Sequence, residues 1–253
     1  MADQSPVLSL VIDDLGYSLQ HGRAAIELQG DHTYAIIPGT HYGKKLARHA
    51  DSLKKEVILH LPLQATNPDA ASESNALHEA MDEDQIAKNL SEMLSEIPSI
   101  KGVNNHMGSF LTEIDYFMRP IMDGIRAYNP NLYFLDSRTS PRSIAYSEAL
   151  ESGLASITRD IFLDNDHTNT ESIHFQYQLW LQKARERGHA IAIGHPHPTT
   201  IRYLQQRLPE TQRHFRFYSV SKLIRQNIAA NNTQPSNAEN QPLAQRVVSA
   251  NID

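Results

Sequence analysis

Apolar runs of strand length recur at regular intervals along the chain. The first reads VLSLVIDD and contains no turn residue before its two aspartates. Most of the runs are continuously apolar instead of alternating, which is typical of parallel strands covered on both faces. The pattern predicts about seven strands, over residues 7–14, 33–38, 56–62, 101–106, 132–136, 154–160 and 190–195.

Helical patterns lie between these runs. The clearest covers residues 170–188, where Thr170 is the expected N-cap, an apolar stripe includes Trp180, and Gly188 stands where the helix should stop. Two further helices are predicted, over residues 82–97 and 113–127. Alternation of strands and helices predicts an α/β fold with a parallel sheet, and about seven such units favour a closed or nearly closed barrel.

The length of 253 residues suits one barrel domain, which we place at residues 1–228. Residues 229–253 are rich in Asn, Gln, Ala and Pro, and we expect a flexible or loosely docked tail. Neither a G-x-G-x-x-G segment nor a phosphate-binding P-loop motif follows the first strand, which disfavours the nucleotide-binding folds.

Composition narrows the possible partners. The formal net charge is −6 and no long basic run occurs, so nucleic acid and anionic membrane surfaces are not expected partners. The chain has no cysteine, which excludes disulfides and thiolate chemistry. No apolar run approaches the roughly 20 residues of a membrane span, and the start shows no secretory leader pattern.

Polar side chains that can bind a metal ion stand at the ends of six predicted strands. Because the carboxyl ends of parallel strands converge on one mouth, these residues are expected to meet there. Pro62 is expected to end the strand that carries His60. The residues, in strand order, are Asp13 and Asp14, then His60, then Asn104, Asn105 and His106, then Asp136, Asp160 and His195.

Each of these residues also has an ordinary structural interpretation. The aspartate pair could cap a helix, His60 could be a core histidine, and His106 could belong to an Asn-rich turn. Asp136 could form an ion pair with Arg138, and the histidines of GHPHP could be loop residues. Their shared position at strand ends favours a functional site over five separate explanations.

The residue types suit metal-assisted hydrolysis. A catalytic divalent ion commonly takes two histidines and one carboxylate, while the reaction needs a base for the water and an acid for the leaving group. Neighbouring residues on a strand point to opposite faces, so Asp13 and Asp14 can serve one site only if the chain bends there.

Several segments together resemble the divergent polysaccharide deacetylase family, a bacterial envelope branch of a larger superfamily. They are VIDDLGY, HLPL, GVNNHMGS, FLDSRTS, RDIFLD and IGHPHP, which follow in order between about residues 7 and 220. The resemblance implies a distorted (β/α) barrel with seven strands. It also implies that Asp13 is the general base, that Asp14 is a metal ligand, and that His195 is the acid.

The H-x-x-x-H segment that supplies two metal ligands in the wider superfamily is absent here. The resemblance therefore points to His60 and His106, from separate strands, as the other ligands of a divalent ion, most simply Zn²⁺. A surrounding shell that orients these groups or binds substrate is expected at Asn104, Asn105, Ser109, Asp136, Arg138, Asp160 and His197.

Three functions remain open from the sequence. The first is a metal-dependent hydrolase that removes N-acetyl or other acyl groups from an envelope glycan. The second is a catalytically silent glycan-binding or envelope-scaffolding protein, and the third is another metal hydrolase such as a phosphoesterase. The resemblance implies a periplasmic or secreted location, with a cytoplasmic one and the oligomeric state left open.

Overall fold

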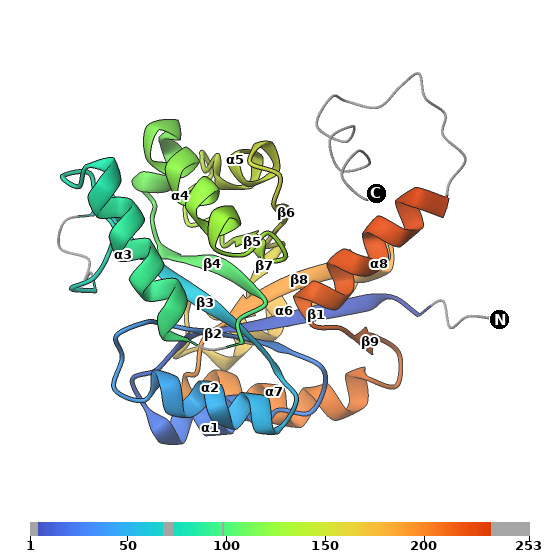
Figure 1. Ribbon diagram of the computed structural model, residues 1–253. Coiled ribbons are helices and arrows are strands. Elements are labelled where there is room, and N and C mark those ends of the chain that lie inside the picture. Colours follow the sequence, from blue (N-terminus) through green and yellow to red (C-terminus); the bar gives the residue numbers. More distant parts are fainter. Residues whose placement is uncertain (1–4, 68–72, 98, 234–253) are drawn as a thin grey trace.

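The computed structural model describes residues 5–67, 73–97 and 99–233 (Figure 1). Its strands are β1 Val7–Leu15, β2 Thr33–Ile36, β3 Glu56–Leu63, β4 Gly102–Met107, β5 Tyr133–Asp136, β6 Ala155–Thr158, β7 Ile161–Phe162, β8 His189–Gly194 and β9 Arg216–Phe217. Its helices are α1 Leu19–Ile26, α2 Gly43–Ser52, α3 Glu83–Glu96, the 3₁₀ turn η1 Leu111–Glu113, α4 Asp115–Tyr128, α5 Ala145–Glu151, α6 Thr170–Arg187, α7 Pro198–Thr211 and α8 Val220–Thr233.

The strands form one parallel sheet in the order of an incomplete barrel. The order is β6-β5-β4-β3-β2-β1-β8-β7, with β9 paired to β1. Strands β6 and β7 follow each other in the chain but occupy the two ends of this order, and within the described ranges no pairing joins them. The expected α/β barrel is confirmed, in a curled and open form.

Alternation along the strands divides the core into an outer and an inner part. On β1, Leu8 and Leu10 pack in the outer cluster, which also holds the buried faces of the helices around the sheet. Val7 and Val11 belong to the inner cluster with inward residues of β2, β3, β5 and β8. Leu223 of α8 joins this inner cluster, so α8 packs against the barrel interior.

All seven predicted strands are present, with three differences. β3 continues through Pro62, which pairs in register with His106 of β4, so Pro62 does not end the strand. The predicted strand at 154–160 stops at Thr158, and the chain resumes as the separate short strand β7. β9 has only two residues, too few to give a hydrophobic pattern.

The predicted helices are also present, with different starts. The N-cap of α6 is Asn169, whose side chain accepts hydrogen bonds from the next turn, whereas Thr170 is its first helical residue. Gly188 ends α6 with φ +82°, a left-handed conformation that favours glycine. The helix predicted over 113–127 begins later, at Asp115, because η1 occupies the preceding residues.

The last described helix crosses residue 228, the expected end of the barrel domain. Helix α8 runs through residue 229 to Thr233, so the first residues assigned to the tail are helical. The rest of the predicted tail, residues 234–253, lies outside the described residues. No helix within the described ranges is long and apolar enough to cross a membrane.

Candidate metal and catalytic site

A bend at the end of β1 brings two consecutive aspartates to the same place. Between Ile12 and Leu15 the register with β2 shifts by one residue, and Asp14 has φ +56°. Such a bulge re-aims a side chain at the end of a strand. Asp13 keeps the inward direction of β1, and the bend turns Asp14 toward the same mouth, as the sequence reasoning required.

Asp14, His60 and His106 bring one ligand atom each to a common point. Asp14 Oδ1 lies 3.1 Å from His60 Nε2 and 2.9 Å from His106 Nδ1. The two histidine nitrogens are 3.2 Å apart. His60 and His106 share the inner face because β3 and β4 are adjacent parallel strands. The structure therefore brings together the three residues that the sequence suggested as metal ligands.

Asn104 orients His60 and the neighbouring Asp13. Its Nδ2 donates to Asp13 Oδ1 at 2.9 Å, so its Oδ1 faces His60 Nδ1 at 2.8 Å. An amide oxygen can only accept, and His60 Nδ1 therefore carries the hydrogen. In the neutral imidazole the lone pair of His60 is then on Nε2, the atom that faces Asp14, whereas in the protonated imidazole Nε2 donates to Asp14.

The two neighbouring carboxylates differ in their electrostatics. Burial raises the pKa of Asp13 above its ordinary value, against the opposing charges of His60 and His195. Burial acts in the same direction on Asp14, but its hydrogen bonds with His106 and His60 outweigh it and hold the pKa of Asp14 far below the usual range. Asp14 is thus a firmly ionised group, and Asp13 is the more basic of the two.

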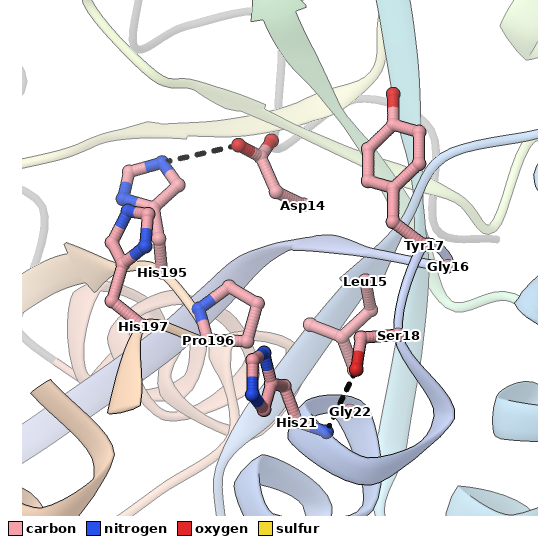
Figure 2. A pocket seen from close by; sticks show the side chains of 10 residues that line it. All are labelled: Asp14, Leu15, Gly16, Tyr17, Ser18, His21, Gly22, His195, Pro196 and His197. Atoms are coloured by element: carbon pink, nitrogen blue, oxygen red, sulfur yellow. Dashed lines mark hydrogen bonds and ion pairs between the residues drawn. The ribbon is translucent and has the colours of Figure 1, made fainter. Parts of the chain in front are cut away.

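His195 forms a dyad with Asp164, which lies just after β7. His195 Nδ1 is 2.9 Å from Asp164 Oδ1, and the backbone N–H of His195 donates to Oδ2 at 2.8 Å. Burial lowers the pKa of His195, but the hydrogen bond with Asp164 and its charge outweigh this and raise it to about 9. His195 Nε2 points the other way, 3.9 Å from Asp14 Oδ2 (Figure 2).

Sequence reasoning missed Asp164 as a site residue. It closes the quoted RDIFLD segment and is fully buried as a side chain. The two-residue strand β7 carries it to the edge of β8, next to the end that carries His195. A second aspartate four residues after Asp160 was the available signal.

Glu73 was missed as well. It accepts a hydrogen bond from the Tyr17 hydroxyl and lies 4.0 Å from His106 Nε2. Glu73 belongs to the long connection between β3 and α3, where no periodic pattern drew attention to it. The Glu73 carboxylate thus lies near Nε2 of His106, the ring nitrogen that does not face Asp14.

Five of the residues expected around the site lie apart from the clustered ligands: Asn105, Ser109, Asp136, Arg138 and Asp160. Asn105 faces the opposite side of β4 from His106, where its oxygen accepts from the Ser137 backbone N–H. Ser109 accepts from the backbone N–H of Thr66. Both side chains thus tie neighbouring loops together.

Asp136 is turned outward by the same alternation. It accepts hydrogen bonds from the backbone N–H of Arg138 at 2.7 Å and from Ser143 Oγ at 2.9 Å. Arg138 itself donates to the Pro141 carbonyl, and no ion pair joins it to Asp136 in the described part of the chain. These contacts stabilise the turn after β5.

Asp160 lies at another part of the sheet. It accepts from the Ile191 backbone N–H at 2.9 Å and forms an ion pair with Arg187 at 3.0 Å. Ile191 is early in β8 and Arg187 ends α6, so these contacts lie toward the amino end of β8, away from the mouth. Asp160 thus joins β6, α6 and β8 and is not brought to the cluster.

His197 lies beside the dyad. Its ring is 5.9 Å from that of His195 and stacks on His167 at 4.0 Å. Together with Asp14 and His195 it lines a pocket of about 180 Å³ that extends along α1 (Figure 2). Of the expected surrounding residues, Asn104 contacts the cluster directly and His197 lies next to it.

Comparison with known proteins gives the family to which this chain belongs. The family model of the divergent polysaccharide deacetylases matches residues 10–224, and the chain belongs to this family. The uncharacterized protein YibQ of Escherichia coli (strain K12) is 33% identical over 242 residues, which are 94% of this chain and 75% of that protein. An uncharacterized protein of Haemophilus influenzae is 35% identical over 206 residues, 80% of this chain and 72% of that protein.

Two solved structures have the same overall fold. The uncharacterized protein ATU2773 from Agrobacterium tumefaciens matches with a TM-score of 0.81 at 20% identity, over 88% of this chain and 91% of that one. The peptidoglycan deacetylase PdaC from Bacillus subtilis matches with a TM-score of 0.51 at 13% identity, over 91% of this chain and 97% of that one. These likenesses concern the fold.

Proposed function

We propose that this protein is a metal-dependent hydrolase that removes N-acetyl groups from an envelope glycan. The observation that carries the proposal is the convergence of Asp14, His60 and His106 beside a buried aspartate and an Asp–His dyad. Membership in the divergent polysaccharide deacetylase family supports the reaction class.

The donor set fits a divalent transition metal, most simply Zn²⁺. Tetrahedral coordination at roughly 2.0–2.1 Å separates the ligand atoms by about 3.2–3.5 Å. The three ligand atoms here are 2.9–3.2 Å apart, so only small shifts would admit an ion. One carboxylate and two imidazoles, with His60 already in the required tautomer, match this metal's preference.

Asp14, His60 and His106 would hold the ion. When bound, it supplies positive charge that polarises the acyl carbonyl and favours deprotonation of a water molecule. Asp13 accepts the proton of the attacking water, for which its burial and raised pKa suit it. Asn104 keeps Asp13 oriented through the hydrogen bond to Oδ1.

His195 serves as the acid. With a pKa of about 9 it is protonated near neutral pH, and its Nε2 faces Asp14 across the mouth. From there it donates a proton to the departing amine, which is a poor leaving group as an anion. Asp164 holds the ring in place and stabilises its charged form. An envelope glycan substrate further implies action in the periplasm or outside the cell.

Acetate release from N-acetylated glycans tests the proposal. The zinc-loaded protein is assayed on chito-oligosaccharides and on peptidoglycan fragments, with Asp13→Asn and His106→Ala as variants. Loss of a general base typically costs 10²–10⁴-fold in rate, and we expect a decrease of this size for Asp13→Asn. Asp51→Asn makes the same chemical change at an exposed position of α2 and is the matched control.

The proposal fails if no acylated glycan is turned over, or if both site variants release acetate at the wild-type rate. Circular dichroism of each variant confirms that the comparison is between folded proteins. Glycan binding that persists without metal and without turnover would instead favour a binding role for the same mouth.

A further inference from the structure

A second group of potential metal ligands lies directly beside the first. One ligand atom each from Asp164, His195 and His197 lies within 4.8 Å of the others. Asp164 follows β7, while His195 and His197 follow β8, so two neighbouring strand ends supply the group. Only His195 and Asp164 are used in the reaction proposed above, and His197 has no part in it.

The hydrogen bonds of this group leave ligand positions available. Asp164 Oδ2 accepts from the His195 backbone and from Thr200 Oγ1, both at 2.8 Å. Asp164 Oδ1 contacts His195 Nδ1 at 2.9 Å. His197 makes no capping hydrogen bond to α7, although it stands at the N-cap, and its ring lies against that of His167.

We propose that Asp164, His195 and His197 form a second, weaker site for a divalent transition metal, and that its occupancy inhibits the enzyme. One carboxylate and two imidazoles are the same donor set as in the first site, and Zn²⁺ accepts them readily. The chemistry therefore allows the same ion at both places.

Spacing makes the second site weaker. The ligand atoms of Asp14, His60 and His106 are already 2.9–3.2 Å apart. In the second group the ring centroids of His195 and His197 are 5.9 Å apart, against 4.9 Å for His60 and His106. To bind an ion together with His195, His197 would move toward the dyad and give up part of its stacking on His167. Preorganised ligands bind more tightly than ligands that must move.

Inhibition follows from the position of His195 Nδ1. An ion between Asp164 Oδ1 and His195 Nδ1 takes the place of the Nδ1 hydrogen, which leaves to solvent as a proton. Asp164 then binds the ion and no longer stabilises the protonated imidazole, so His195 keeps only its Nε2 hydrogen and is a much weaker acid. This consequence rests on the proposed function, whereas binding of the second ion does not.

Zinc titration of the metal-free protein tests the binding. A chromogenic chelator competes for the ion, and stoichiometry is measured by elemental analysis. We expect two classes of site in the wild type, the second at least tenfold weaker. His197→Phe retains an aromatic ring beside His167 but has no ligand atom, and it should lose the weaker class. Asp14→Ala should lose the tighter class and retain the weaker one.

His167→Phe is the matched control, because His167 lies outside the proposed ligand set. It should retain both classes of zinc site. A wild type that binds a single ion, or a weaker class that survives His197→Phe, would overturn the inference. Circular dichroism of each variant establishes that lost binding does not come from unfolding.

Activity at increasing zinc supplies the second measurement. Acetate release by the wild type and by His167→Phe should decline as the weaker class fills, and the zinc concentration for half inhibition should rise at least tenfold in His197→Phe. Hydrolysis without a second zinc class would refute this inference and leave the proposed function intact. Two zinc classes without hydrolysis on any substrate would refute the proposed function and the inhibitory role, and leave the second site standing.

Discussion

Replacing Asn104 by leucine removes both of the hydrogen bonds by which this side chain orients the site. Asn104 is fully buried and joins His60 to Asp13 through its own oxygen and nitrogen. Leucine has a similar size but neither donates nor accepts. His60 Nδ1–H then loses its partner, and the imidazole can move its hydrogen to Nε2, the nitrogen that faces Asp14. A hydrogen on Nε2 blocks its use as a metal ligand.

The magnitude follows from the partners that are lost. Removing a hydrogen-bond partner behind a ligating histidine typically costs 10–100-fold in metal affinity. This corresponds to about 1.4–2.8 kcal/mol. Asp13 also loses the donor that lowers its pKa, so its pKa should rise further and the acidic limb of the pH–rate profile should move to higher pH.

The assay is a zinc dissociation constant measured by chelator competition, together with the pH dependence of acetate release. Ser137→Ala is the matched control, because it removes only the 3.2 Å hydrogen bond from Asn104 Nδ2 to Ser137 Oγ. It should keep zinc affinity within about threefold of the wild type. A zinc affinity of Asn104→Leu within twofold of the wild type would refute the reasoning about the His60 tautomer.

Three further predictions concern the dyad, acid stability and the helix inside the barrel. In Asp164→Asn, the pKa of His195 should fall from about 9, because the negative charge that raises it is removed. NMR titration of the histidine measures this pKa, and an unchanged value would contradict the Asp164–His195 dyad. Burial lowers the pKa of His32 to about 3, whereas its pKa in the unfolded chain is 6.5. The unfolded chain therefore takes up a proton more readily, so the free energy of unfolding is highest above pH 6.5 and falls as the pH drops below that value. At pH 5 this lowers the free energy of unfolding by about 2 kcal/mol. The free energy of unfolding, measured with urea, should therefore fall less between pH 7 and pH 5 in His32→Gln than in the wild type; an equal fall in both proteins would refute this. Leu223→Ala opens a cavity where α8 packs into the barrel and should cost about 2–5 kcal/mol in unfolding free energy, and a change below 1 kcal/mol would show that α8 contributes little there.

Hydrophobic patterning was sufficient to predict the fold class. Continuous apolar runs such as Ala190–Ile193 mark parallel strands because both faces of the sheet are covered, by helices outside and by the inner cluster inside. The two-residue strands β7 and β9 escaped prediction because no period can be read from two residues. Pro62 remained within β3 although proline was expected to end the strand.

The candidate site was predictable where strand alternation could be applied. Asp13, His60, Asn104 and His106 share the inner face, and the structure brings them together. The same alternation turns Asp136 to the outer face, where it binds a turn. Assigning alternate positions of each strand to the inner and outer faces would have separated the inward site residues from Asp136.

The amino-acid sequence is enough to locate the main strands and the polar side chains they carry, because these strands are continuous apolar runs. Which of those polar side chains meet depends on the folded chain. The left-handed bend at Asp14 redirects one carboxylate, and the pairing of β7 with β8 brings Asp164 to His195, 31 residues away. Neither depends on a local pattern: the bend is a single backbone conformation held by its neighbours, and strand pairing depends on contacts between distant segments.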